Sequence, residues 1–179
     1  MDVVYPLFSR IAKMATQQCP CGYYNHPDKE CSCAPGTVQK YLNKVSGPLL
    51  DRIDLHVEVT PVSFDQISSS RKSETSEEIR ERVVKARKIQ EIRYQDHPGI
   101  HCNALMPPEM VKEICQIGEP GKLQLKRAME KIGLSARVYD RILKVSRTIA
   151  DLAESEEIRI EHLAEAIQYR SLDRENWAG

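Results

Sequence analysis

The sequence predicts a mainly α-helical fold that contains one short β-strand. Aromatic residues make up only 6% of the 179 residues and β-branched runs are short, which disfavours a large sheet. From residue 76 onward, apolar residues recur three and four positions apart, as on the buried face of a helix. Sustained alternation of apolar and polar residues is confined to residues 53–59. The length of 179 residues suits one ordinary domain or two small ones, and the hydrophobic content of 41% indicates a globular chain.

The N-terminal part is predicted to be irregular up to residue 35, because it is rich in proline and cysteine. A short helix is expected next, with Thr37 as its N-cap. The Gly47–Pro48 pair should break that helix, because proline lacks the N–H that a helix interior needs.

The segment IDLHVEV at 53–59 is predicted to be a strand with one buried face, ended by Pro61. The apolar residues expected on the buried face are Ile53, Leu55, Val57 and Val59. His56 alternates with them, so we expect it to face solvent or a neighbouring subunit. A lone strand leaves unpaired edges, so the rest of its sheet should lie upstream or on another molecule.

A polar linker is expected before residue 76, followed by five helices. The first should begin at Ser76 and close before His97. The others are expected to begin at Pro107–Pro108, near Leu123, after the cap Ser135 and after Arg159, with Gly133 ending the third helix.

Bulk charge gives no evidence for a nucleic-acid or membrane partner, because 26 basic residues balance 26 acidic ones. No apolar run approaches the roughly 18 residues that a membrane span needs. The first residues also lack the features of a signal peptide, so a cytoplasmic protein without membrane contact is expected. The basic residues at 80–93 alternate with glutamates and indicate a solvated helix face more than a DNA-binding stripe.

Four of the six cysteines form two C-x-C doublets with a histidine, His26, between them. The doublets are Cys19 with Cys21 and Cys31 with Cys33. Four thiolates suit tetrahedral zinc, and the interval between the doublets can fold back over one ion. His26 is an alternative ligand, and four reduced thiols without metal is the competing interpretation.

Two long strings carry a resemblance to a known family: CPCGYYNHPDKECSCAPGTVQKYLNKVSGPLLDRIDLHVEV and LSARVYDRILKVSRTIADLAESEEIRIEHLAEAIQYRSLDR. They resemble the magnesium-chelatase-like AAA+ ATPases, nearest to the bacterial ComM/YifB group linked to DNA uptake and recombination. The resemblance covers about residues 19–174, whereas residues 1–18 do not fit the family pattern. It implies a C-terminal fragment, divided into a remnant of the α/β core (1–60), a linker (61–75), a helical lid (76–174) and a tail (175–179).

The resemblance also implies a function for the full-length protein. It would form a homo-oligomeric ring, expected to be a hexamer, in which ATP hydrolysis with Mg²⁺ drives DNA remodelling such as branch migration. The rival interpretation is a non-enzymatic, zinc-stabilised helical adaptor that binds DNA or protein.

Three arginines match functional positions of the family. Arg52 matches the arginine finger, which reaches the γ-phosphate of a neighbouring subunit and stabilises charge in the transition state. Arg137 matches sensor-2, at a helix N-terminus that itself favours phosphate. Arg141 lies one turn further on the same face and is a weaker candidate for the same ATP-phosphate site. The alternatives are that Arg52 pairs with Asp51 or Asp54, and that Arg137 is a solvated first-turn residue.

The chain has no phosphate-binding loop of the form G-x-x-x-x-G-K-[ST]. Its Gly121–Lys122 pair is followed by Leu123, and Gln116 stands where the first glycine belongs. An apolar run ending in Asp-Glu, which would supply a magnesium ligand, is also missing. We therefore expect this chain alone to hydrolyse no ATP.

Overall fold

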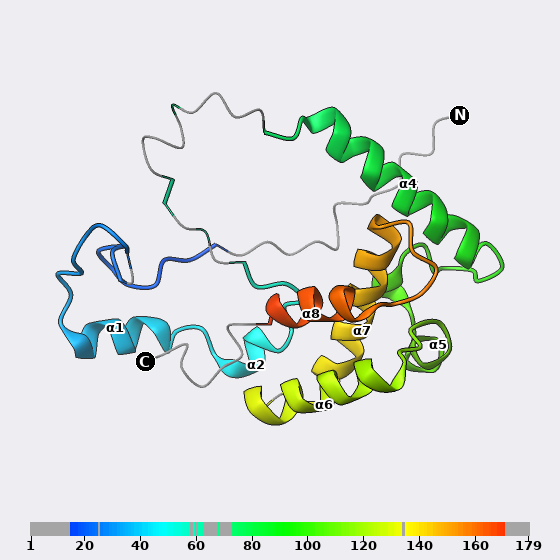
Figure 1. Cartoon of the computed structure of the whole chain (residues 1–179). Helices are drawn as coiled ribbons and strands as arrows, with labels where there is room; N and C mark the ends of the chain where they lie inside the picture. Colours follow the sequence, from blue (N-terminus) through cyan, green and yellow to red (C-terminus); the bar gives the residue numbers. More distant parts are fainter. Residues whose placement is uncertain are drawn as a thin grey trace. The chain divides into compact units, whose positions relative to one another are not determined.

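The computed structural model describes residues 15–24, 26–57, 59, 61, 62, 68, 73–133 and 135–170. These residues contain seven α-helices and one 3₁₀-helix, so the predicted mainly helical fold is confirmed (Figure 1). The chain forms two compact units, one up to Lys44 and one from Val45. Predictions for residues 1–14, for most of the linker and for the tail lie outside the described residues.

The first unit contains helix α1, Pro35–Leu42. It begins three residues before the position that the Thr37 cap predicts, with Ala34 as the N-cap. Proline is tolerated in a first helical turn because its missing N–H would have no partner there. Val38 and Leu42, one turn apart, are the buried residues of this helix.

The second unit begins with α2, Gly47–Leu50. The Gly47–Pro48 pair does not break α1, which already ends at Leu42; it starts this new helix instead, because Pro48 occupies its first turn. Ser46 is the N-cap, and Leu50 is the buried residue at the other end.

The predicted strand at 53–59 is wrong: no strand forms among the residues that the structure describes. The N–H of His56 donates to the carbonyl oxygen of Tyr169, at the end of a helix, at 2.8 Å. His56 is only 6% exposed, whereas Leu55 and Val57 are 49% and 64% exposed. The buried side is therefore opposite to the predicted one, because the segment packs on a helix end and no strand in the described part of the chain covers its apolar side.

The predicted helical bundle is confirmed over residues 76–170. Its helices are α4 (Ser76–Tyr94), α5 (Pro108–Ile114), α6 (Glu119–Ile132), α7 (Ala136–Leu152) and α8 (Ile160–Gln168). A 3₁₀-helix, η1 (Asn103–Leu105), precedes α5 and is not predicted from the sequence. Within the described ranges, no helix is both long and apolar enough to cross a membrane.

Local capping explains several of the helix boundaries. Thr75 forms a capping box with Glu78 at the start of α4, one residue before the predicted opening at Ser76. Gly133 ends α6 with a φ of 69°, in the left-handed region that glycine adopts without strain. Ser135 is the N-cap of α7, as predicted.

Helix α7 is the centre of the second unit and packs against α4, α5, α8 and η1. Val138 and Ile142 of α7 and Leu163 of α8 are almost fully buried in the shared core. On α4, the buried stripe consists of Ala86, Gln90 and Tyr94. Ile79 and Val83 continue the predicted stripe but are 42% and 38% exposed.

Candidate functional site

Arg52 lies in the turn that follows α2. Its N–H donates to the carbonyl oxygen of Leu49 at 3.0 Å, and the N–H of Ile53 donates to that of Leu50 at 3.0 Å. Each bond joins an N–H to the carbonyl three residues earlier, so the chain makes one tight turn directly after α2. The Arg52 side chain is exposed and forms no ion pair within the described part of the chain.

The alternative partners of Arg52 are engaged elsewhere. The carboxylate of Asp54 receives a hydrogen bond from the guanidinium of Arg141 at 2.5 Å. The carboxylate of Asp51 lies 3.5 Å from the hydroxyl oxygen of Ser135. Both contacts join the turn to the start of α7 and leave the Arg52 guanidinium facing outward.

Arg137 lies in the first turn of α7 and is exposed. The Ser135 side chain makes no capping hydrogen bond to this turn. The first-turn N–H groups therefore keep their partial positive charge, to which the Arg137 guanidinium adds a full one. These positive charges can attract a phosphate group electrostatically.

Arg141 lies one turn after Arg137 and contacts the turn directly. One nitrogen of its guanidinium, Nη1, donates to the carbonyl oxygen of Arg52 at 2.7 Å and to Asp54 at 2.5 Å. The side chain is 31% exposed, and that of Asp54 is 57% exposed. The structure therefore brings Arg52 and Arg141 together through the backbone of Arg52.

The buried side of the same turn is held by two residues that sequence reasoning missed. The guanidinium of Arg170, only 1% exposed, donates to the carbonyl oxygen of Ile53 and, at 3.4 Å, to that of Leu50. The Nε2 atom of His56 lies 3.3 Å from the same Leu50 oxygen. No sequence pattern identifies these contacts, because Arg170 and Ile53 are 117 positions apart.

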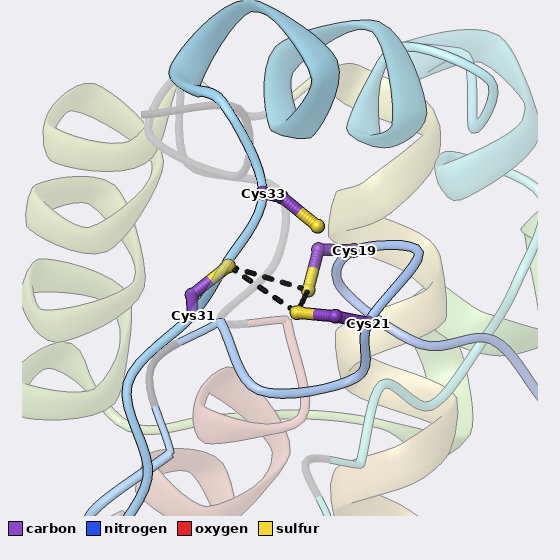
Figure 2. Close-up of side chains that lie close together, drawn as sticks. All are labelled: Cys19, Cys21, Cys31 and Cys33. Atoms are coloured by element: carbon purple, nitrogen blue, oxygen red, sulfur yellow. Dashed lines mark hydrogen bonds between the residues drawn. The ribbon is translucent and has the colours of Figure 1, made fainter.

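The four cysteines of the two doublets converge in the first unit, and Figure 2 shows their side chains gathered at the loop that precedes α1. All four sulfur atoms lie within 4.8 Å of one another. The Cys19 sulfur lies 3.3 Å from that of Cys21 and 3.7 Å from that of Cys31, and the sulfurs of Cys21 and Cys31 are 3.5 Å apart. A tetrahedral zinc ion with bonds of about 2.3 Å holds its sulfurs roughly 3.8 Å apart, so the four residues fit such an ion.

The four-sulfur group forms without His26, whose Nδ1 atom accepts the N–H of Asp28 at 3.0 Å. Cys19 is fully buried and the other three cysteines are partly buried. Hydrogen bonds from the Tyr23 backbone and then from the neighbouring thiols lower the pKa of Cys21 to about 5, against burial. One thiolate is therefore already favoured at neutral pH in this cluster, which can bind a metal cation.

Two family models match the sequence. The model described as "Magnesium chelatase, subunit ChlI C-terminal" matches residues 73–170, and the one described as "Magnesium chelatase, subunit ChlI" matches residues 2–67. The first of these covers more than half of the chain.

The chain belongs to the magnesium chelatase ChlI family.

Within this family, the chain is similar to proteins of the ComM/YifB group. It is 39% identical to the competence protein ComM of Haemophilus influenzae over 87% of the chain and 29% of that protein. It is 34% identical to YifB of Escherichia coli and to YifB of Salmonella typhimurium, over 96% of the chain and 33% of each relative. The chain therefore spans about a third of the length of the curated relatives it matches.

The ChlI match also corrects one expectation from the sequence. Residues 1–18 do not resemble the family by their motifs, but the matched region begins at residue 2.

The Gly121–Lys122 pair lies inside α6, and the Lys122 amine is 2.7 Å from the Glu119 carboxylate. Because both residues are in a regular helix, the pair does not form a phosphate-binding loop.

Proposed function

We propose that this chain is the C-terminal part of a ring-forming AAA+ ATPase that remodels DNA. In this proposal Arg52 is the arginine finger, which acts on ATP bound by the neighbouring subunit. Arg137 is the sensor-2 residue, and the ring consists of identical subunits, expected to be six. ATP and Mg²⁺ would be bound by the phosphate loop and acidic residues of the full-length protein.

The observation that carries the proposal is the exposed guanidinium of Arg52, which has no ion-pair partner among the residues that the structure describes and lies on a turn whose backbone is held by side chains. An arginine that serves only as a structural ion pair would use the neighbouring carboxylates, but Asp54 binds Arg141 instead. A finger needs the opposite arrangement, namely a fixed backbone and a free cation. A second exposed cation, Arg137, lies on α7, the helix whose Arg141 contacts the same turn.

Membership of the ChlI family supports the ATPase class, and the similarity to a competence protein supports DNA as the substrate. The chemistry assigned to Arg52 is electrostatic: its positive charge would stabilise the charge that develops on the transferred phosphoryl group. An arginine in this role is worth about 10³–10⁵ in rate.

The proposal is tested by measuring ATP turnover of the full-length protein with Arg52→Ala. Turnover should fall at least about 10³-fold while nucleotide affinity is largely kept, because a finger acts mainly on the transition state. Arg127→Ala is the matched control, since Arg127 is an exposed arginine on α6 outside the turn. Unchanged turnover in Arg52→Ala would reject the finger, whereas a full-length wild-type protein without ATP turnover would favour the non-enzymatic adaptor.

For the cysteine cluster we propose structural zinc, bound by Cys19, Cys21, Cys31 and Cys33. Four sulfur ligands leave no open position for substrate, which is the arrangement of a structural site. The convergence of four thiols from two doublets supports this assignment. Its role would be to hold the loop before α1 in one conformation.

A further inference from the structure

Three backbone carbonyls around Arg52 accept hydrogen bonds from arginine side chains. Arg141 of α7 binds the carbonyl oxygen of Arg52, and Arg170, just beyond α8, binds those of Leu50 and Ile53. The two guanidiniums reach the turn from different helices, one partly exposed and one buried. We call this pair of arginines, Arg141 and Arg170, the carbonyl clamp.

The clamp acts on the backbone of Arg52, whose side chain forms no ion pair within the described ranges. The carbonyl of Leu50 also accepts the N–H of Ile53 at 3.0 Å, so the arginine bonds add to the backbone bond that closes the turn. A guanidinium has several donors in a rigid plane, so it can hold two acceptors in a fixed relation. Arg170 does so with Leu50 and Ile53, and Arg141 does so with Arg52 and Asp54.

Both clamp residues belong to the helical bundle, on α7 and at the end of α8. His56 adds a third connection to the same end, because its N–H donates to the Tyr169 carbonyl oxygen at 2.8 Å. A shift of α7 and α8 would therefore carry the turn with it. The finger position would then depend on the position of the helices.

We propose that Arg141 and Arg170 are positioning residues that fix Arg52 to the helical bundle, so that the finger moves with α7 and α8 as one body. The proposal rests on the proposed function of Arg52. It assigns Arg141 a role different from the phosphate contact that the sequence resemblance implies, because its guanidinium is bound to Asp54 and to the Arg52 backbone.

Turnover measurements on the full-length protein separate the two roles of Arg141. For a positioning residue, Arg141→Ala should lower kcat by about 10–100-fold, because a small misplacement of a catalytic group costs up to about 10²-fold. KM should change less than about twofold, since no nucleotide contact is lost. In an Arg52→Ala background the same change should have no further effect, because no finger remains to be positioned.

Asp54→Ala is the second variant. If Arg141 positions the turn, loss of its carboxylate partner should lower kcat as well. If Arg141 instead binds phosphate, Asp54→Ala releases it and should leave kcat unchanged or raise it. Arg141→Ala should then raise KM, and it should still lower kcat in the Arg52→Ala background. An unchanged or raised kcat in Asp54→Ala, or a raised KM with a further loss of kcat in the double variant, would overturn the proposal. Arg127→Ala again serves as the control.

Hydrogen exchange on this 179-residue chain gives a readout independent of ATP. Arg141→Ala should speed amide exchange in residues 50–56 while exchange in α4 stays as in the wild type. Unchanged exchange in residues 50–56 would overturn the clamp. Because Arg170 is buried, Arg170→Lys is the variant to use there, with thermal unfolding as the check that the chain is folded.

The clamp and the proposed function fail in different ways. If Arg52→Ala leaves turnover unchanged, the finger is rejected whatever the clamp variants do. If Arg52→Ala lowers turnover but Arg141→Ala does not, the finger stands and the clamp is rejected.

Discussion

The guanidinium of Arg93 on α4 makes two hydrogen bonds to the carboxylate of Asp151 on α7, at 2.8 and 2.5 Å. Asp151 has no solvent exposure, and its carboxylate also accepts from Arg147 at 3.1 Å and from the Asn103 amide at 2.8 Å. One buried carboxylate thus joins α4, η1 and α7. The Asp151 hydrogen bonds raise the pKa of Arg93 above its ordinary value.

Asp151→Ala should strongly destabilise the second unit. It leaves two arginines next to a buried site without their counter-charge, a loss that costs about 3–5 kcal/mol. Urea unfolding followed by circular dichroism measures the free energy of unfolding. The matched control is Lys85→Ala, which breaks the exposed pair with Glu154 and should leave that free energy close to the wild-type value. Equal effects of the two substitutions would contradict this account of Asp151.

The capping box at the start of α4 predicts a pH dependence. The backbone N–H and then the hydroxyl of Thr75 bind Glu78 and hold the pKa of its carboxyl below the ordinary value of 4.5. A lowered pKa in the folded state means that the carboxylate stabilises the fold at neutral pH. That stabilisation is lost as the pH falls below 4.5 and through the lowered pKa.

The measurement is a carbon NMR titration of the Glu78 carboxyl group. Its midpoint should lie below 4.5 in the wild type and move upward in Thr75→Ala, which removes the hydroxyl partner. The first amides of α4 should exchange faster at acid pH in step with this titration. A midpoint that is identical in both proteins would show that the Thr75 hydroxyl does not act on the Glu78 carboxyl.

Elemental analysis tests the cysteine cluster. Protein purified without chelator should contain about one zinc ion per chain, with zinc–sulfur distances of roughly 2.3 Å by X-ray absorption. Cys31→Ser with Cys33→Ser should lose the metal and speed amide exchange in residues 19–33, with α4 to α8 unchanged. Cys102→Ser is the control, because Cys102 lies outside the cluster. A reduced, freshly prepared sample without metal would contradict the site.

The isolated chain should show no ATP hydrolysis and at most weak nucleotide binding. It lacks the glycine loop that cradles phosphates, and an exposed arginine attracts a phosphate charge by only about 1 kcal/mol at 4 Å in water. A phosphate-release assay and a calorimetric titration with ATP measure the two quantities. Hydrolysis that persists through purification and is lost in Arg52→Ala would mean that the chain itself holds a complete active site.

The helices follow from local sequence, which is why they could be predicted. Gly133 and Ser135 mark the end of α6 and the start of α7 through contacts within a few residues. The strand at 53–59 fails for the opposite reason. Alternation predicts which residues lie on the same side of an extended segment. Which of the two sides is buried depends on the element that packs against it, and here His56 contacts the end of α8.

The candidate site divides in the same way. The spacing of the cysteine doublets predicts their convergence, because two short loops suffice to bring four sulfurs together. The clamp contact between Arg170 and Ile53 joins residues 117 positions apart, and neither residue carries a motif for it. Resemblance identifies Arg52 and Arg137 as candidates, whereas their backbone surroundings are visible only in three dimensions.

The most direct test of the account is a mixing experiment with two inactive forms of the full-length protein. One carries Arg52→Ala, and the other carries a disabled phosphate loop. A ring of either form alone has a defect at every interface. In mixed rings, an intact loop meets an intact Arg52 at about a quarter of the interfaces, because each interface joins different surfaces of two subunits. The account predicts partial recovery of ATP turnover on mixing. If mass analysis shows that mixed rings form and turnover stays absent, Arg52 does not act across the interface.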